Sequence, residues 1–277
     1  MIDTHCHIVF GVDDGSDCAE ESIEMARIAI NSGITDIIAT PHCIPGMFEN
    51  FVGRGYEEGF RRLFTELEAE ELTGKLRIHR GMEAFADRTT LECFDRGLLH
   101  CLGKTNYLLI ECDFGEDPRV FRDILSGLIH RDIRPVIAHP ERYFFAQDDA
   151  RYLFDYLEMG CVLQLDTDSI LGNFGRSSRS CALKLLENGV AQLAGSDAHD
   201  AVSRTPDMRL CADFVADNFS GEYAELLFDI NPARLLANKP LHFIEGSAAI
   251  RQHSDSRRNE THGRSSRFMS DEEYWGI

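Results

Sequence analysis

The sequence has little positive charge and no apolar run long enough to span a bilayer. Its 28 Lys and Arg residues stand against 47 Asp and Glu residues, which gives a formal net charge of -19. Clustered Lys and Arg hold phosphate backbones, so this balance argues against a general nucleic-acid-binding protein. Acidic membrane surfaces would also repel the chain. Because Met1 is followed by Asp and His without a basic and apolar leader, we expect a cytoplasmic protein with no membrane insertion.

The sequence also lacks paired cysteine motifs and common phosphate-handling loops. Its nine cysteines are scattered and never form Cys-x-x-Cys, which argues against a disulfide framework or a zinc ribbon. No cysteine is followed six residues later by arginine, so the Cys-x5-Arg loop of thiol phosphatases is excluded. Gly103, Lys104 and Thr105 resemble the end of a P-loop, but Leu98 occupies the position of its first glycine. A phosphate-binding P-loop is therefore excluded as well.

The length and apolar content favour one large domain. With 277 residues and 43% hydrophobic residues, the chain can bury a large core. We assign residues 1–244 to a single α/β domain. From Glu245 onward the sequence becomes rich in Ser, Arg, His, Asn and Asp, and we expect residues 245–277 to form a disordered polar tail.

Short apolar strands alternate with amphipathic helices along the domain. Asp17 and Glu20 resemble a capping box that opens one helix, which Gly33 ends, and Asp117 and Pro118 suit the start of another. The strands expected after the first one, which carries His5 and His7, are Ile34–Thr40, a strand through Leu76 and Ile78, Asn106–Cys112, Ile133–Ala138, Val162–Asp166 and Val190–Ala194. About seven strand-then-helix units predict a parallel sheet of the β/α barrel type.

Histidines and carboxylates recur where these strands end. His5 and His7 are two residues apart on a strand, so their imidazoles can point to one place. The carboxyl ends of barrel strands converge on one face, where active sites of such folds are built. The candidate ligands are His5, His7, Asp14, His42, Glu83, Glu111, His139, Asp197 and His199.

Nine nitrogen and oxygen donors suit a cluster of two or three divalent ions bridged by a carboxylate. Mixed imidazole and carboxylate ligands fit Mn, Fe or Zn. Asp13 competes with Asp14 for one ligand position, and the sequence leaves this choice open. Cys6 and Cys112 neighbour ligands on strands, where adjacent side chains point to opposite faces, so we expect both to pack in the core.

These motifs resemble the polymerase and histidinol phosphatase (PHP) superfamily, and more closely the bacterial manganese-dependent protein-tyrosine phosphatases of capsule and exopolysaccharide operons. The resemblance covers residues 1 to about 240. The segments that carry it are Met-Ile-Asp-x-His-x-His at the start, the Asp-Asp-Gly loop ending at Gly15, Thr40-Pro41-His42, Gly46-Met47-Phe48-Glu49, Gly81-Met82-Glu83, Glu111, Ala138-His139-Pro140-Glu141-Arg142-Tyr143 and Gly195-Ser196-Asp197-Ala198-His199.

The resemblance implies a distorted (β/α)7 TIM-like barrel with a trinuclear site, in which Mn is the first choice of metal. One ion would be held by His5, His7, Glu83 and Asp197, a second by Glu83, Glu111 and His139, and a third by Asp14, His42 and His199. Arg142 matches the family's catalytic arginine, and Arg204 matches a second arginine near the site. The implied reaction is hydrolysis of phosphotyrosine by a metal-activated hydroxide, on a tyrosine kinase that controls polysaccharide synthesis.

Two other functions remain open on the same barrel. One is a phosphatase for a small metabolite such as histidinol phosphate, and the other is a binding module that has lost catalysis. An exonuclease, another activity of the superfamily, is disfavoured by the acidic balance. Phe48 and Phe51, in the loop after His42, could pack on a phosphotyrosine ring or within the loop itself.

Overall fold

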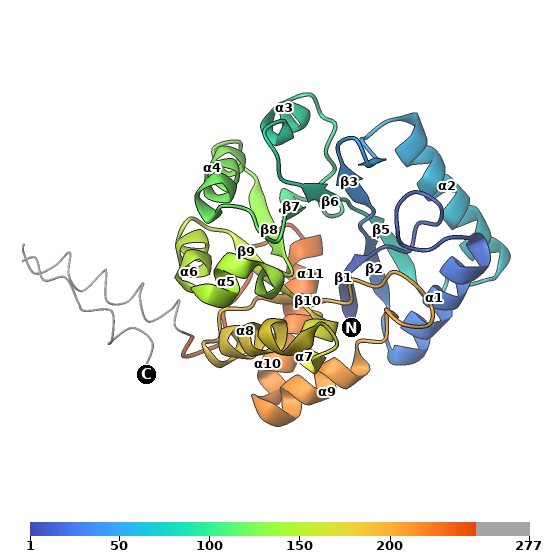
Figure 1. The fold of residues 1–277 in the computed structure, drawn as a ribbon. Helices are drawn as coiled ribbons and strands as arrows, with labels where there is room; N and C mark the ends of the chain where they lie inside the picture. The colour runs from blue at the N-terminus through green and yellow to red at the C-terminus, as the bar shows by residue number, and fades with distance from the viewer. Residues whose placement is uncertain (248–277) are drawn as a thin grey trace, which may run out of the picture.

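In the computed structural model, residues 1–247 are described, and they form a barrel of parallel strands surrounded by helices (Figure 1). Most of the predicted polar tail lies outside these residues. Two hydrogen-bonded sheets contribute the strands, in the orders β1-β2-β5 and β10-β9-β8-β7-β6-β3-β4. The strands are β1 (Ile2–Cys6), β2 (Asp36–Ala39), β3 (His42–Ile44), β4 (Phe48–Glu49), β5 (Arg77–Arg80), β6 (Glu83–Phe85), β7 (Tyr107–Glu111), β8 (Arg134–Ala138), β9 (Val162–Asp166) and β10 (Leu193–Gly195).

The barrel closes where the first strand meets the last. Cys6 forms a parallel bridge with Ala198, and the backbone N–H of His7 donates to the carbonyl of Ala198 at 2.9 Å. Every strand pair is parallel except β3–β4, a short antiparallel hairpin at the edge of the larger sheet. The predicted distorted α/β barrel is confirmed.

Two of the barrel strands are broken in the middle. β2 resumes as β3 after Thr40-Pro41, and β5 resumes as β6 after Gly81-Met82. Pro41 has no N–H to donate, but its carbonyl accepts the N–H of Glu83 at 3.1 Å. The two resumed strands pair in parallel with His42 opposite Glu83. The breaks therefore bring two candidate ligands to adjacent positions, and β2/β3 and β5/β6 act as single strands in a barrel of seven.

The helices cover the outside of the barrel (Figure 1). The α-helices are α1 (Ala19–Ser32), α2 (Arg54–Ala69), α3 (Thr90–Asp95), α4 (Pro118–Ile129), α5 (Phe144–Asp148), α6 (Arg151–Glu158), α7 (Thr167–Leu171), α8 (Gly175–Glu187), α9 (Arg209–Asn218), α10 (Gly221–Glu225) and α11 (Asn231–Leu236). A 3-10 turn, η1 (Pro140–Arg142), follows β8, and a π-helical turn, η2 (Leu226–Ile230), joins α10 to α11.

Helix starts agree with the sequence in one case and differ in another. Asp117 caps α4 by accepting the N–H of Arg119, with Pro118 in the first turn, as predicted. The predicted capping box at Asp17 is wrong. Helix α1 begins at Ala19 with Cys18 at the N-cap position and has no side-chain cap, and the N–H of Asp17 donates to the carboxylate of Glu21, not of Glu20, at 2.8 Å.

The core lies between the strands and the helices. Cys6 and Cys112 are buried within it, as predicted, and every cysteine among residues 1–247 is a free thiol. Within that range no helix is both long and apolar enough to cross a membrane.

Candidate metal centre

All nine predicted ligands lie at the carboxyl ends of the barrel strands. They fall into three overlapping groups whose ligand atoms lie within 4.8 Å of one another. The groups are His5, His7, Glu83 and Asp197; His42, Glu83 and Glu111; and His7, Asp14, His42 and His199. The ninth residue, His139, lies beside Glu83 and Glu111. Residues separated by up to 194 positions in the chain therefore meet at one place.

The first group is fully buried and joins the first strand to the last. The Nε2 atoms of His5 and His7 are 3.1 Å apart, and each lies 3.2–3.4 Å from Glu83 Oε2 and Asp197 Oδ1. Two imidazole nitrogens and two carboxylate oxygens thus surround a common point. Gln164, on β9, orients His5 through a 2.9 Å contact between its Oε1 and His5 Nδ1.

The second group is centred on the carboxylates of Glu83 and Glu111. His42 Nδ1 lies 2.9 Å from Glu83 Oε2 and 3.0 Å from Glu111 Oε1. His139 Nε2 lies 3.0 Å from Glu83 Oε1 and 3.6 Å from Glu111 Oε2. The two oxygens of Glu83 therefore face different histidines, which is the arrangement that a bridging carboxylate requires.

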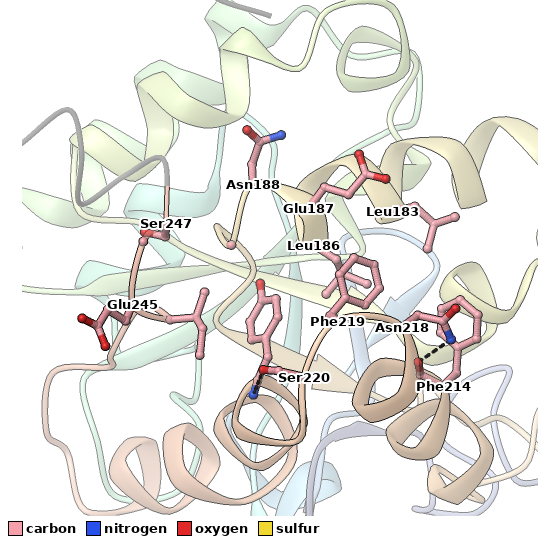
Figure 2. A pocket seen from close by; sticks show the side chains of 14 residues that line it. Leu183, Leu186, Glu187, Asn188, Phe214, Asn218, Phe219, Ser220, Glu245 and Ser247 are labelled. Atoms are coloured by element: carbon pink, nitrogen blue, oxygen red, sulfur yellow. Dashed lines mark hydrogen bonds between the residues drawn. The ribbon is translucent and has the colours of Figure 1, made fainter. Parts of the chain in front are cut away.

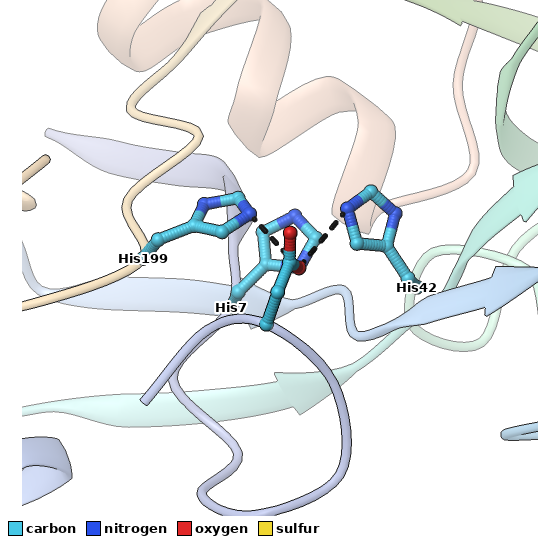
Figure 3. A group of neighbouring side chains, drawn as sticks. His7, His42 and His199 are labelled. Carbon is cyan, nitrogen blue, oxygen red and sulfur yellow. Dashed lines mark ion pairs between the residues drawn. The ribbon is translucent and has the colours of Figure 1, made fainter. Parts of the chain in front are cut away.

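The third group gathers around Asp14, whose side chain is 55% exposed. Asp14 Oδ1 lies 3.4 Å from His42 Nε2 and 3.3 Å from His199 Nε2. Figure 3 shows the imidazoles of His7, His42 and His199 turned toward this carboxylate. The sequence places Asp14, His42 and His199 here, and the structure adds His7, whose ring centroid is 4.0 Å from that of His199.

The carboxylate of Asp13 has a different environment. Its Oδ2 is 2.8 Å from His7 Nδ1 and accepts the backbone N–H of His42, also at 2.8 Å, while its Oδ1 accepts the N–H of Gly15. Asp13 is thus engaged behind the imidazole of His7, whereas Asp14 faces the open side of the cluster. This geometry favours Asp14 as the ligand and gives Asp13 an orienting role.

The cluster is built to hold positive charge. The buried atoms His42 Nδ1, Glu83 Oε2 and Glu111 Oε1 face one another as ion pairs at 2.9 and 3.0 Å. Burial lowers the pKa of His42, but the charge of Glu83 and the side-chain interactions with Glu111 and Glu83 together outweigh it and raise this pKa to about 10. The hydrogen bond with His199 lowers the pKa of Asp14 to about 2. Ionised carboxylates facing imidazole nitrogens in these positions fit divalent cations.

Two residues of the site have strained backbones. His139 and Asp197 have φ angles of 34° and 48°, in the left-handed region that residues other than glycine rarely adopt. Such strain persists where the surrounding structure imposes it, and it clusters at functional sites. Both residues directly follow or lie close to a strand end, so the strained turns aim their side chains into the barrel mouth.

The two predicted arginines meet at Asp197. Arg142 Nη1 donates to Asp197 Oδ2 at 3.2 Å, and Arg204 Nη2 donates to the same oxygen and to the carbonyl of Asp197. The ring of Phe174 lies 4.4 Å from the guanidinium carbon of Arg142 and 5.3 Å from that of Arg204. One aromatic ring from the loop between α7 and α8 therefore contacts both cations.

Asp166 and Phe174 belong to this site although the sequence analysis did not select them. The carboxylate of Asp166 is buried, which together with the charge of Asp197 raises its pKa well above the usual range, and its Oδ2 lies 3.8 Å from Arg142 Nη1. Asp166 ends β9, so its strand-end position is a signal that could have found it. Phe174 carries no such signal, because only the folded chain places its loop between two arginines.

The two aromatic residues that follow His42 have different surroundings. Phe48 is half-buried and stacks on His42 with a centroid distance of 5.9 Å and an interplanar angle of 10°. Phe51 packs against the hydrophobic core and is a structural residue of the loop.

A pocket of about 560 Å³ lies away from the cluster, between the end of α8, the start of α10 and residues 244–247 (Figure 2). Its walls include Leu186, Phe219 and Tyr223, and none of the nine candidate ligands lines it. The chemistry of the chain is therefore concentrated at the opposite, carboxyl end of the strands.

A TIM-like barrel with histidines and carboxylates converging at the carboxyl ends of its strands defines a metal-dependent hydrolase. The family model described as "Capsular polysaccharide synthesis, CpsB/CapC" matches residues 1–237. The chain belongs to this CpsB/CapC family.

Named relatives and solved structures agree with this assignment. The chain is 32% identical over 241 residues to the tyrosine-protein phosphatase YwqE of Bacillus subtilis, covering 87% of this chain and 93% of YwqE. It is 30% identical to the tyrosine-protein phosphatase CpsB of Streptococcus pneumoniae, covering 86% of this chain and 99% of CpsB. A crystal structure comes from work on these two enzymes, which are described as unique metal-dependent tyrosine phosphatases. It matches this chain with a TM-score of 0.82 at 30% identity, covering 89% of this chain and 98% of the chain in the crystal.

More distant structures share only the fold. A β-aspartyl dipeptidase of Fervidobacterium islandicum matches with a TM-score of 0.59 at 14% identity, over 90% of this chain and 76% of the dipeptidase. The barrel fold is thus shared with this neighbour, and the specific chemistry depends on the site residues.

Proposed function

We propose that this chain is a metal-dependent protein-tyrosine phosphatase that uses His5, His7, Asp14, His42, Glu83, Glu111, His139, Asp197 and His199 as metal ligands. The observation that carries the proposal is the meeting of all nine donors beside two arginines, in a chain whose relatives are named tyrosine-protein phosphatases. A binding module that had lost catalysis would be expected to have lost ligands.

Divalent ions held here would lower the pKa of a bound water molecule and neutralise the oxygens of a phosphoryl group. Mn is the preferred ion, with Fe and Zn as alternatives that the ligand types also suit. Glu83 would bridge two ions, since its two oxygens face different histidines. Asp13 and Gln164 would hold the rings of His7 and His5 in position.

Arg142 and Arg204 would bind the phosphoryl oxygens of the substrate. Both guanidinium groups lie beside Asp197, at the edge of the cluster, and planar guanidinium groups can contact two phosphoryl oxygens at once. The phenolate released from phosphotyrosine has a parent pKa of about 10, so it needs less proton donation than a sugar alkoxide. No dedicated acid is required by this scheme.

The substrate that we propose is a tyrosine kinase that regulates synthesis and export of capsular or extracellular polysaccharide in the cytoplasm. The family description and the names of the relatives place them in capsular polysaccharide synthesis. A phosphatase of this kind would reset the phosphorylation state of the kinase, and the polysaccharide itself would not enter the site.

The test uses protein that has been stripped of metal and reloaded separately with Mn, Fe or Zn. We expect two to three ions per chain, and hydrolysis of a phosphotyrosine peptide with a higher kcat/KM than of histidinol phosphate. Glu83→Ala should clearly lower the metal content. Absence of phosphotyrosine hydrolysis in every reloaded form would contradict the proposal, and a preference for histidinol phosphate would replace it with the metabolite phosphatase.

A further inference from the structure

A cleft of about 330 Å³ lies next to the candidate metal centre, between the start of α5 and the start of α8. Three of its residues are phenylalanines: Phe114 and Phe174 are half-buried, and Phe144 is 59% exposed. The three rings line one cleft, and it is such contiguous apolar surface, not a single exposed side chain, that marks a binding site. A cleft of this size can accept a large side chain of a bound protein.

The cleft and the metal centre share a wall. The guanidinium carbon of Arg142 lies 4.8 Å from the ring centroid of Phe114 and 4.4 Å from that of Phe174, and both rings line the cleft. The same guanidinium donates to Asp197 in the metal centre. Phe114 also meets the ring of His139 edge-on, with centroids 6.0 Å apart. A substrate bound with its phosphate at Arg142 would therefore have the cleft beside it.

The polar groups at the cleft floor are already engaged within the protein. Gln147 donates to the carbonyl of Glu141 at 2.9 Å and to Ser178 Oγ at 3.3 Å. The backbone N–H of Phe144 donates to the carbonyl of Phe114 at 2.9 Å, which fixes the position from which its side chain projects. The cleft thus offers a ligand the three aromatic rings, which bind apolar side chains, with Arg142 and Arg176 also in its lining.

We propose that this cleft is a specificity subsite for a large apolar side chain, such as leucine or phenylalanine, that flanks the phosphotyrosine in the substrate protein. The inference rests on the proposed phosphatase function and assigns a substrate preference to it. The occupant follows from the aromatic walls and the continuity with Arg142. Phenyl phosphate has no flanking residue, so we expect changes in the cleft to leave its hydrolysis unchanged.

The test compares two sets of phosphotyrosine peptides, in which leucine or glycine occupies the positions within two residues of the phosphotyrosine, with phenyl phosphate as the small substrate. We expect the unmodified, metal-loaded enzyme to prefer the best leucine peptide over its glycine counterpart by about tenfold in kcat/KM, the effect of partly burying one leucine. Phe144→Ala should reduce this preference to below about twofold and leave phenyl phosphate hydrolysis unchanged. Leu210→Ala, at a 69% exposed position on α9, is the matched control and should keep the preference.

A second variant blocks the cleft instead of opening it. Ser177 is exposed and lines the cleft at the start of α8, so Ser177→Trp should also abolish the preference for leucine peptides. Equal kcat/KM for leucine and glycine peptides, or an unchanged preference in both variants, would overturn the subsite while leaving the phosphatase function intact. Equal losses for peptides and phenyl phosphate would instead mean that the cleft holds the phosphotyrosine ring itself, which also overturns it. No hydrolysis of any phosphotyrosine peptide would contradict the proposed function.

Discussion

Asp13 and Asp14 are neighbours in the chain, yet their carboxylates face different groups. Asp13 is buried against His7 Nδ1 and the N–H groups of His42 and Gly15, whereas Asp14 faces His42 and His199 from the solvent side. A buried carboxylate that accepts several hydrogen bonds contributes to stability, while an exposed one contributes little until an ion binds. The two residues should therefore separate folding from metal binding.

We predict that Asp13→Asn mainly lowers the stability of the metal-free protein, whereas Asp14→Asn mainly lowers the metal content. In metal-free protein, Asp13→Asn should lower the free energy of unfolding by about 2 kcal/mol, because it weakens buried hydrogen bonds to a charged group. Asp14→Asn should change it by less than about 1 kcal/mol but remove up to one ion per chain. Urea unfolding and elemental analysis measure the two quantities. The reverse pattern would assign the ligand role to Asp13.

At the same scale, residue type and strand-end position were enough to predict the nine candidate ligands. The choice between Asp13 and Asp14 was not predictable, because it depends on how the loop folds back on His7. Phe174 was also not predictable, since its contacts with Arg142 and Arg204 join three loops that are distant in the sequence. Sequence patterns therefore identify ionisable and metal-binding side chains more readily than they identify the neutral residues that position those side chains.

Among the elements, the broken strand β5/β6 makes the clearest prediction. A Cβ added at Gly81, in the break, would lie 2.8 Å from Ile38 Cγ2 and 3.2 Å from the carbonyl of Ala39. Gly81→Ala should therefore cost about 1–3 kcal/mol of stability and lower metal-dependent activity, since the break positions Glu83. Gly74→Ala is the control, because its Cβ would meet no heavy atom within 4 Å. Similar stability of the two variants in thermal unfolding would show that the break is not tightly packed.

A second prediction concerns the opposite ends of β2 and β5. Burial raises the pKa of Asp36, but hydrogen bonds from Arg77 and His79 outweigh it and lower this pKa to about 2. A lowered carboxyl pKa stabilises the fold above the usual pKa of about 4, and this stabilisation is lost as pH falls toward 2. Asp36→Asn should thus lower the free energy of unfolding by about 1–2 kcal/mol at pH 7, with solvent screening at the exposed Arg77 limiting the effect.

The measurement is denaturant unfolding of both proteins between pH 7 and the lowest pH at which they remain folded. The difference between them should shrink as pH falls below 4. A difference that stays constant with pH would mean that the contribution of Asp36 comes from packing and not from its charge.

Element boundaries show where local sequence signals suffice. Asp117 and Pro118 start α4 as predicted, because a cap needs only its own helix. The similar signal at Asp17 failed because the helix starts at Ala19, with Cys18 at the N-cap position. The resumption of β2 as β3 and of β5 as β6 was not predicted, since it depends on pairing between strands that are adjacent only in the barrel.

For the molecule as a whole, metal binding should contribute measurably to stability. The ligands come from every part of the barrel, so ions bind the folded chain far better than the unfolded one. At a free metal concentration about 100 times the dissociation constant, one such site adds about 2.7 kcal/mol. For a domain of this size, we expect Mn to raise Tm by about 5 °C over the chelator-treated protein. Glu83→Ala, which lacks the bridging carboxylate, should show a clearly smaller increase.

The architecture was the most predictable level. Seven alternating strand and helix units implied a parallel barrel before any contact was known, because parallel strands require crossover helices and their carboxyl ends share a face. The closure of that barrel by Cys6 and Ala198 was a consequence of the architecture. The aromatic cleft was not predictable, since its three phenylalanines lie in loops whose lengths and directions only the folded chain defines.

The meeting of His5 and His7 with Asp197 and His199 has a consequence for biosynthesis. A nascent chain presents its first two ligands at the start of translation but cannot offer their partners until almost 200 residues have been made. Ion capture is therefore among the last events in maturation, and a chain that terminates before Asp197 releases an incomplete set of ligands. A complete cluster can therefore form only after the ribosome has synthesised the last strand of the barrel.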